Sequence, residues 1–348
     1  MRTYLVTGGA GFIGSNLVQM LLQSGHRVIV LDAFTYAANL QSLADARAHP
    51  AFHLIHGSIA DAAALDRAFS FEPDGVLHLA AESHVDRSID SPEAFIQTNV
   101  VGTYRLLETS LGYWRNRKTL MSGFRFLHVS TDEVFGSLGS DGYFSESSPY
   151  NPSSPYSATK AAADHLVRSY HRTYGLPIVI TNCSNNYGPF QFPEKLIPHT
   201  ILCCLKGLTI PVYGSGLHSR DWLHVSDHCQ GLIAAMTAGK DGETYLFGTG
   251  QEHSTLEVVG AVCRVIDELR PRADGKSYYT QIEHVRDRPG HDWRCAIDAS
   301  LSVKTLGWKP QTLFTSGITQ TVRWYLDNPS WVQAAVAQGY LPTRQGIR

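Results

Sequence analysis

The sequence has no long apolar segment and little net charge. No uninterrupted apolar run reaches the roughly 18 residues that a membrane-spanning helix requires. The 348 residues carry a formal net charge of -2, so neither nucleic acid nor an anionic membrane is an expected partner. A strand-like run, Tyr4–Thr7, begins almost at once, and we therefore expect no signal peptide and a cytoplasmic protein.

Cysteine is sparse and its spacing is unfavourable for cross-links or zinc. None of the six cysteines forms a CxxC pair, and Cys203 directly precedes Cys204. Such neighbours suit neither a disulfide nor a zinc site, so we expect reduced, buried thiols. The nearest approach to a metal site is His224 and His228 beside Asp227, which lacks further ligands. We expect no metal.

Short apolar runs alternate with amphipathic stretches in the first half of the chain. The expected strands are Tyr4–Thr7, Arg27–Leu31, His53–His56, Gly75–Leu79, Arg125–Ser130 and Ile178–Asn182. The expected helices between them are Phe12–Ser24, Ala60–Phe69, Pro92–Leu111 and Tyr156–Tyr174. This alternation predicts an α/β fold with a Rossmann-type, doubly wound parallel sheet.

The alternation loosens in a segment rich in proline and glycine, 186–216. We therefore expect a first domain over 1–186 and a smaller C-terminal α/β lobe for substrate over 187–348. Some later elements are expected to return to the first sheet. The boundary is placed by composition alone.

A glycine-rich loop, G-x-x-G-x-x-G, lies between the first expected strand and helix. Gly8 permits a tight turn, Gly11 allows a pyrophosphate to approach the backbone, and Gly14 allows the helix to pack on the strand. Asp32 ends the second strand, where a carboxylate can hold both hydroxyls of an adenosine ribose. Ala33 beside it offers no charge for a 2′-phosphate, so we expect NAD rather than NADP.

Two short segments carry groups suited to catalysis. Tyr156 and Lys160 are four residues apart on an expected helix and share a face. A nearby ammonium and a bound nicotinamide charge are expected to lower the tyrosine pKa, so that a phenolate can deprotonate an alcohol. Thr131, Asp132 and Glu133 follow an expected strand at its carboxyl end, which faces the ligand crevice in such sheets. The two acids are suited to acid/base work, although helix capping or surface pairing explains their spacing equally well.

The chain resembles the extended short-chain dehydrogenases/reductases and, more narrowly, the dTDP-glucose 4,6-dehydratases. The glycine-rich loop and the YxxxK spacing are typical of the superfamily. The Thr-Asp-Glu triplet is typical of the dehydratases. The matching segments are 7–14, 31–40, 78–88, 130–136, 156–160, 185–196, 220–222 and 287–292. They extend over nearly the whole chain.

The resemblance implies a three-step reaction with a tightly bound NAD that is regenerated in each cycle. Tyr156, aided by Lys160 and Thr131, deprotonates the sugar 4-hydroxyl while hydride leaves C4. Glu133 then removes the C5 proton, and Asp132 protonates the departing 6-hydroxyl. Hydride returns to C6 and C5 is reprotonated, which yields a 4-keto-6-deoxy sugar nucleotide.

The resemblance also implies binding residues and an assembly. The implied cofactor contacts are Gly8, Gly11, Phe12, Ile13, Gly14, Asp32, Ser58, Ile59, Tyr156 and Lys160. The implied nucleotide-sugar contacts are Ser83, Asn186, Glu194, Lys195, Arg220, Arg288 and His291. A homodimer is implied, with Ala161, Ala162, Leu166 and Tyr170 facing a partner or, equally, belonging to the core of one chain.

Five positions depart from the family pattern. Ser58 replaces an aspartate at the adenine, Leu246 and Thr255 replace asparagines, and Cys295 and Phe135 replace tyrosines. We expect three of them, at Leu246, Thr255 and Cys295, to lie towards the substrate nucleotide. The base of that nucleotide, dTDP against UDP, is therefore left open.

Two other functions compete with dehydration. A UDP-sugar 4-epimerase or a UDP-glucuronate decarboxylase would share the fold, NAD, Tyr156 and Lys160, but neither reaction expels the 6-hydroxyl and neither needs an acid at Asp132. A non-catalytic NAD-binding scaffold would not require the complete set of reactive groups. The residues therefore favour the dehydratase.

Overall fold

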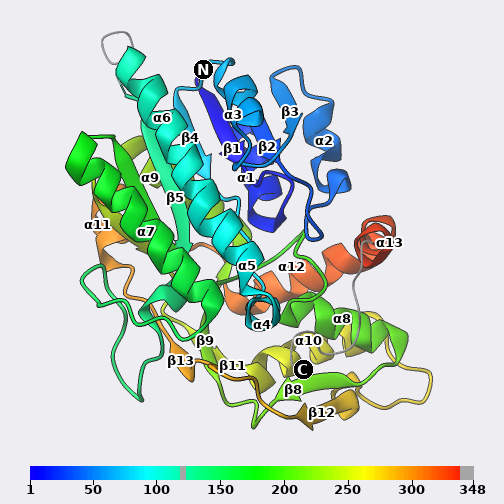
Figure 1. Cartoon of the computed structure of the whole chain (residues 1–348). Coiled ribbons are helices and arrows are strands. Elements are labelled where there is room, and N and C mark those ends of the chain that lie inside the picture. Colours follow the sequence, from blue (N-terminus) through cyan, green and yellow to red (C-terminus); the bar gives the residue numbers. More distant parts are fainter. Residues whose placement is uncertain (118–122, 338–348) are drawn as a thin grey trace.

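A seven-stranded parallel sheet forms the centre of the computed structural model, which describes residues 1–117 and 123–337 (Figure 1). The strands run in the order β10-β6-β5-β4-β1-β2-β3. Their bounds are β1 Thr3–Thr7, β2 Arg27–Asp32, β3 Phe52–His56, β4 Gly75–His78, β5 Arg125–Thr131, β6 Ile178–Cys183 and β10 Thr244–Phe247. The order reverses direction at β1 and β4, where doubly wound sheets bind ligands. The predicted fold class is confirmed.

Helices cover both faces of this sheet because successive strand residues point to opposite sides. Val6 and Val30 pack in the core on one face, whereas Leu5 and Ile29 pack on the other. The first face is covered by α1 (Phe12–Gln23) and α9 (Val225–Ala238), and the second by α3 (Ala62–Phe69), α6 (Thr103–Arg117) and α7 (Pro155–Tyr174). Figure 1 shows α6 and α7 side by side on the outside.

The stretch expected as a single helix from Pro92 is interrupted. It consists of α5 (Pro92–Phe95), a π-helical segment (Ile96–Gly102) and then α6. The wide turn brings Asn99 into the interior, where it is 1% exposed and its Nδ2 donates to Thr159 Oγ1 of α7 at 3.0 Å. Insertions of this kind are frequent at functional sites.

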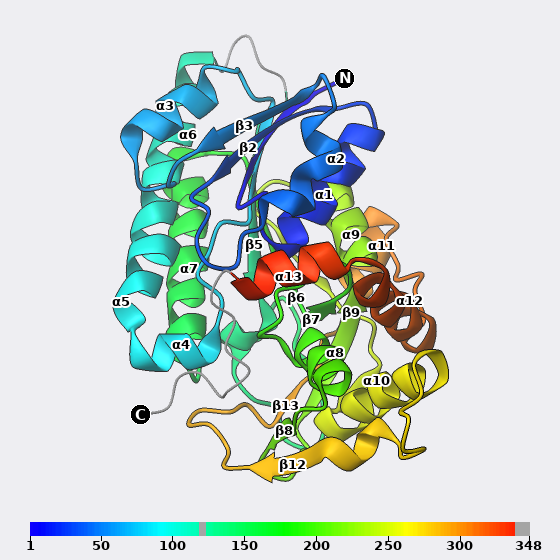
Figure 2. The same ribbon diagram turned by 90° about the vertical axis from the view of Figure 1, so that its right-hand side faces the viewer.

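A second lobe lies beyond the carboxyl ends of the strands (Figure 2). Its short strands are β7 Asn185–Tyr187, β8 Ile210–Tyr213, β9 Ser219–His224, β11 Glu252–Ser254, β12 Ile282–Val285 and β13 Arg294–Cys295, and its helices are α8 Leu196–Lys206, α10 Thr255–Leu269, α12 Phe314–Asp327 and α13 Pro329–Ala337. β9 pairs with β7, β11 and β13, while β8 pairs with β12. Most of these strands are short and contain polar residues. The sequence therefore lacks the apolar periodicity that would have predicted them.

The two lobes are interleaved along the chain. β10 pairs in parallel with β6 and so extends the first sheet, and α11 (Ser300–Leu306) contacts it through Ser302, whose hydroxyl donates to the Leu246 carbonyl at 2.6 Å. The second lobe also contacts the first domain: Trp331 Nε1 of α13 donates to Ser42 Oγ at 2.8 Å. The remaining short elements are α2 Ala44–Arg47, α4 Val85–Asp90 and the 3₁₀ turns 40–43, 132–135 and 278–281. Within 1–117 and 123–337, no helix has the length and apolarity to cross a membrane.

Candidate active site

A cavity of about 400 Å³ opens at the carboxyl ends of the central strands. It brings together every residue that was predicted for the cofactor and every residue that was predicted for catalysis. These residues are Gly8, Gly11, Phe12, Ile13, Gly14, Asp32, Ser58, Ile59, Thr131, Asp132, Glu133, Tyr156 and Lys160. Residues from widely separated parts of the chain therefore line one cavity, at the edge of the sheet where we expected the ligand crevice.

The glycine loop forms a cradle that side chains would fill. Gly8 has φ +72°, and a Cβ atom there would lie 2.7 Å from the Ala80 nitrogen. A Cβ atom on Gly14 would lie 2.1 Å from the Gly8 carbonyl oxygen. Among the described residues, no side chain caps the start of α1 at Gly11, so the first amides of this helix remain available to an anion. The loop therefore fits a dinucleotide pyrophosphate.

Asp32 holds the same loop from the end of β2. Its Oδ2 accepts a hydrogen bond from the Ala10 amide, and its Oδ1 accepts one from the Phe34 amide, both at 2.8 Å. Burial raises the pKa of Asp32, and these two bonds oppose the rise. Ser58 also lines the cavity, with its Oγ accepting from the Ala60 amide at 3.1 Å. The carboxylate and hydroxyl are thus placed to meet an adenosine.

Tyr156 and Lys160 enter the cavity from the first turns of α7. Pro155 occupies the first turn, and Ser154 caps the helix by a reciprocal bond with Ser157. Both reactive side chains are buried, with exposures of 9% for Tyr156 and 4% for Lys160. Tyr156 and Lys160 therefore share one face of α7, as predicted, and this face points into the protein.

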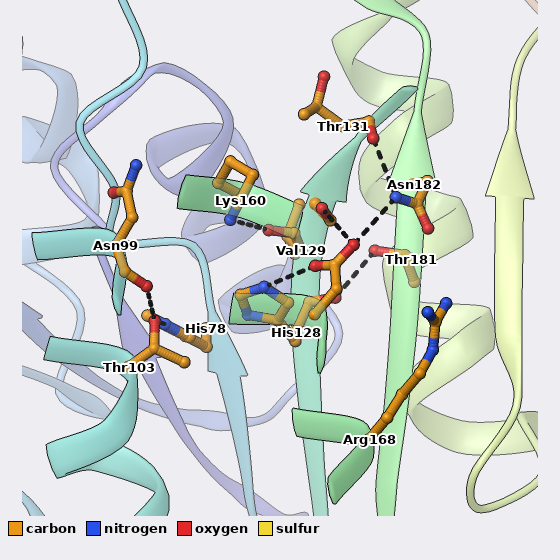
Figure 3. A network of polar contacts seen from close by, with 12 residues as sticks. His78, Asn99, Thr103, His128, Val129, Thr131, Lys160, Arg168, Thr181 and Asn182 are labelled. Atoms are coloured by element: carbon orange, nitrogen blue, oxygen red, sulfur yellow. Dashed lines mark hydrogen bonds and ion pairs between the residues drawn. The ribbon is translucent and has the colours of Figure 1, made fainter. Parts of the chain in front are cut away.

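The predicted lowering of the Tyr156 pKa is not produced by the protein's own groups. Burial raises the pKa of Tyr156 well above its ordinary value, the Glu133 charge raises it further, and only a hydrogen bond with Thr131 opposes this. Lys160 instead donates to the Val129 carbonyl oxygen at 2.8 Å (Figure 3). Burial lowers the Lys160 pKa to about 8. Tyr156 is therefore a neutral phenol in the chain by itself.

The two acids lie in a single 3₁₀ turn directly after β5. Thr131 begins the turn, and its Oγ1 accepts a hydrogen bond from the Glu133 amide at 3.3 Å. Asp132 is 2% exposed, and among the described residues its Oδ2 has no hydrogen-bond partner. Neither acid forms an ion pair with a surface cation in the described part of the chain, which was one of the two alternatives for their spacing. The other was helix capping, but Thr131 rather than either acid caps the turn.

The environment separates the two acids chemically. Burial and the nearby Glu133 charge raise the Asp132 pKa to about 8, so Asp132 holds a proton at neutral pH. Burial also raises the Glu133 pKa, but the Arg288 and Arg220 charges act against it. A buried acid that holds its proton, beside a second carboxyl group with cationic neighbours, is suited to proton donation and proton removal in one place.

A second cavity, of about 240 Å³, adjoins the first. The two share Glu133, Asn185, Glu194 and Lys195, so they meet beside the acid pair. All seven predicted substrate residues line one or both: Ser83 and Asn186 the first, Glu194 and Lys195 both, and Arg220, Arg288 and His291 the second. The second cavity is mostly built by the C-terminal lobe.

Several of these substrate residues already have partners within the chain. Glu194 accepts from the Tyr36 hydroxyl at 2.8 Å and lies 3.4 Å from Arg87 Nε. Lys195 Nζ donates to the Ser83 carbonyl oxygen at 3.0 Å, and Asn186 Oδ1 lies 2.9 Å from His228 Nδ1. These contacts join the two lobes around the cleft and fix the side chains that line it.

Cationic groups gather at the second cavity. Arg288 Nη1 lies 3.2 Å from Asp86 Oδ1, while its buried Nε has no hydrogen-bond partner among the described residues. Arg220 Nη2 donates to the Asp292 carbonyl oxygen at 2.6 Å. Two guanidiniums beside Lys195 suit a diphosphate.

Three groups that the sequence did not connect meet at the same cavity. His218 Nε2 lies 3.1 Å from Asp287 Oδ2, and His291 Nδ1 lies 2.7 Å from Asp287 Oδ1. Together they have the composition of a cation site. Burial lowers the His291 pKa to about 3, and the Arg288 and Arg220 charges contribute to this. The same two positive charges act against a bound cation.

Two of the departures from the family pattern lie in the interior of the protein. Leu246 and Cys295 are fully buried in a hydrophobic cluster with Val134 and Phe135, and neither lines either of the two cavities described above. The expectation that both face the nucleotide is therefore wrong, since strand packing behind the acid turn places them in the interior. Thr255 does line the second cavity.

Buried polar residues below the cavity were missed. Asn99 accepts from the Glu82 amide at 2.9 Å and donates to Thr159 beside Lys160. Asp164 is completely buried one turn after Lys160 on α7. The i,i+4 spacing from Lys160 was the only available signal for Asp164, and a π-helical turn has no sequence pattern that would have revealed Asn99.

Known proteins resemble this chain over nearly its full length. The family model described as GDP-mannose 4,6 dehydratase matches residues 5–321. A dTDP-glucose 4,6-dehydratase of Xanthomonas campestris pv. campestris (strain B100) is 54% identical over 348 residues, covering 99% of each chain. A dTDP-glucose 4,6-dehydratase from Streptomyces venezuelae, solved with NAD and TYD bound, is 43% identical with a TM-score of 0.87, covering 96% of this chain and 99% of that one.

An epimerase shares the architecture at lower identity. The UDP-glucose 4-epimerase of Thermus thermophilus, solved with NAD, is 29% identical with a TM-score of 0.82 and covers 94% of this chain and 99% of that one. The fold and the cavity thus define a member of the extended short-chain dehydrogenases/reductases. Within this class, the chain belongs to the dTDP-glucose 4,6-dehydratase family.

Proposed function

We propose that the protein converts a nucleoside-diphosphate glucose, dTDP-glucose in the first place, to the 4-keto-6-deoxy sugar nucleotide with NAD as cofactor. The observation that carries this proposal is the acid pair. Asp132, with a pKa of about 8, and Glu133 share the cavity of Tyr156 and the glycine loop. The 54% identical relative, a dTDP-glucose 4,6-dehydratase, supports the same reaction.

The residues of the chain divide the reaction among them. Tyr156, as the phenolate that the charge of a bound NAD would favour, takes the proton of the 4-hydroxyl, and Thr131 forms a hydrogen bond with the Tyr156 oxygen. Glu133 removes the proton at C5, and Asp132 gives its proton to the departing 6-hydroxyl. NAD, when bound, supplies the acceptor and later the donor of hydride, together with a positive charge. Once water has left, Asp132 is an anion and Glu133 an acid. Glu133 returns to a carboxylate by protonating C5, and Asp132 regains a proton from Tyr156, which holds the one taken from the 4-hydroxyl.

The binding roles proposed for the cleft follow the two cavities. The glycine loop, Asp32 and Ser58 hold NAD. In the substrate cleft, Ser83, Asn186, Glu194 and Lys195 orient the sugar, whereas Arg220, Arg288 and His291 hold the diphosphate and nucleoside. Both sets line the cavities that meet at Glu133.

The acid pair also separates this reaction from its competitors. A 4-epimerase or a UDP-glucuronate decarboxylase needs Tyr156 but no buried acid that is still protonated at neutral pH. Asp132 has that property because burial and Glu133 raise its pKa to about 8. A scaffold without catalysis would have no use for it.

We expect the purified protein to form a C6 methyl group with deuterium at C5 when dTDP-glucose is supplied in deuterated water. Glu133 and the solvent exchange the C5 proton while water leaves across C5 and C6. NMR spectroscopy of the product measures both signals, and UDP-glucose in a parallel reaction tests the base. Epimerised or decarboxylated product, or no turnover of either nucleotide sugar, would refute the proposal.

We propose a domain division and a location as well. Residues 1–186 form the NAD-binding domain, and 187–348 mainly the sugar-nucleotide lobe, with β10 returning to the first sheet. All six cysteines are free and buried, which suits the reducing cytoplasm. The proposed ligand is a nucleotide sugar, with no nucleic-acid or membrane partner.

A homodimer through α6 and α7 is proposed from the exposed aromatic residues there. Tyr104 and Tyr174 are 40% and 42% exposed on these adjacent helices. Among the residues predicted for this contact, Ala161 and Tyr170 are buried within the chain, and Ala162 and Leu166 are partly buried. The contact would therefore use the rim of α7 rather than its inward face.

Replacing both exposed tyrosines by glutamate is expected to halve the mass measured by light scattering. Two charges on each copy would have to be buried without partners, which is unfavourable. Tyr279→Glu is the matched control, because Tyr279 is 49% exposed on the other lobe. A parent protein that is monomeric at working concentration would dismiss the dimer.

A further inference from the structure

A completely buried carboxylate, Asp164, lies below the cavity without lining it. Its Oδ2 accepts from Tyr150 Oη at 2.7 Å and from Ser130 Oγ at 2.9 Å. Its Oδ1 lies 3.1 Å from His128 Nε2, whose side chain is also completely buried. Removing a carboxylate from water is expensive unless hydrogen bonds and opposite charges compensate it, so the partners of Asp164 are needed to hold its charge in the interior.

The contacts of Asp164 join the two halves of the candidate site. Asp164 is on α7, one turn after Lys160, whereas Ser130 lies at the end of β5, just before the acid turn. Asn182 of β6 donates to the Thr131 carbonyl oxygen at 2.9 Å (Figure 3). It also donates to Asp164 Oδ2 at 3.4 Å. One carboxylate thus links the helix of Tyr156 to the strand end that carries Asp132 and Glu133.

The same carboxylate is the anion available to Lys160 below the cavity. Lys160 is 4% exposed and donates to the Val129 carbonyl, which bears no net charge. Burial lowers the Lys160 pKa to about 8, and the Asp164 charge acts against that fall. Among the described residues, His78 on β4, His128 on β5 and Cys183 on β6 also interact electrostatically with Lys160, and Tyr156 lies one turn before it on α7.

None of these other groups replaces the negative charge. Burial lowers the His78 pKa far below its usual value and the His128 pKa to about 4, so both rings are neutral at pH 7. Burial raises the Cys183 pKa, so the thiol keeps its proton. Burial also acts to raise the Asp164 pKa, but His128, Lys160 and Tyr150 outweigh it, and the net shift is downward. Asp164 is therefore ionised.

We propose that Asp164 is a positioning residue that keeps Lys160 protonated and holds the Lys160 helix against the acid turn. The inference rests on the proposed function for its meaning, because the family resemblance assigns to a charged Lys160 a part in oxidising the sugar with Tyr156. It concerns the chain's own residues, however, and can be measured without substrate.

The test is competitive labelling of Lys160 with acetic anhydride across pH, read by peptide mass spectrometry. Only the neutral amine reacts, and Lys160 lines the cavity that the reagent enters. The parent midpoint is expected near pH 8. Asp164→Asn removes the anion and is expected to lower the midpoint by about 1–3 units, the usual effect of losing a close opposite charge.

Two variants separate charge from architecture. Tyr150→Phe removes one hydrogen bond to the same carboxylate, and Asp164→Glu keeps the charge, so both are expected to retain a midpoint near that of the parent. If Asp164→Asn does not fold, these two variants still test the inference. A labelling midpoint that falls in Asp164→Glu, which keeps the negative charge, contradicts it. An unchanged midpoint in folded Asp164→Asn would overturn it.

The rate of C4 oxidation supplies a second readout. In Asp164→Asn its decline at high pH is expected to move to lower pH together with the labelling midpoint, whereas a purely structural defect would reduce the rate equally at every pH. If the parent turns over no nucleotide sugar, the proposed function fails while the labelling result still stands. If the parent is active and the variant profile is unmoved, the Asp164 inference alone fails.

Discussion

Asp132→Asn is expected to slow loss of water by about 10²–10⁴ while the initial oxidation at C4 continues. An amide has the size of the acid but no proton to give to the 6-hydroxyl. The variant should therefore accumulate NADH and the 4-keto intermediate, which single-turnover absorbance and mass spectrometry of the quenched mixture can follow. Equal loss of both steps would contradict the assignment of Asp132 as the acid.

The pH dependence of the parent tests the same assignment. Burial and Glu133 raise the Asp132 pKa to about 8, and the acid acts only while it holds its proton. Dehydration should therefore be maintained below about pH 8 and decline as the pH rises through that value. Asp141→Asn is a matched control on an exposed acid and should change neither step. Glu133→Gln should instead abolish exchange at C5.

Tyr156→Phe is expected to reduce C4 oxidation by about 10²–10⁴ and so to remove both later steps. The variant loses only the hydroxyl that takes the proton of the sugar, since the ring remains packed against Phe95. Stopped-flow absorbance should show almost no NADH, whereas NAD binding, measured by calorimetry, should be retained.

The control for this variant is Tyr143→Phe. Tyr143 is 54% exposed and outside both cavities, so its hydroxyl should be dispensable. NADH formation at the parental rate in Tyr156→Phe would mean that another group takes the proton. Loss of NAD binding in that variant would instead mean that the hydroxyl holds the cofactor.

Local sequence was enough to predict the parts of the site that depend on neighbours in the chain. The Gly8–Gly14 loop needs only a strand, a tight turn and a helix, and Tyr156 and Lys160 share a face because of helical periodicity. The acid turn follows from its place at the end of β5. The same reasoning predicted the parallel sheet and placed all these segments at one edge.

Other features depend on contacts between distant segments, and sequence reasoning was wrong or silent on them. Leu246 and Cys295 were expected near the nucleotide, yet packing against Val134 buries them. Lys160 together with a bound nicotinamide charge was expected to lower the Tyr156 pKa, yet Lys160 donates to Val129 on another element and burial raises the Tyr156 pKa. The π-helical turn that buries Asn99 breaks the expected helix.

The sequence by itself determined the fold class and the set of reactive groups, because both are recorded in local periodicity and spacing. Only the tertiary structure decided how those groups behave. The protonated Asp132, the Lys160 pKa near 8 and the ionised Asp164 arise from burial and from charges on other elements. Burial is a property of the packed chain, so no short segment contains it.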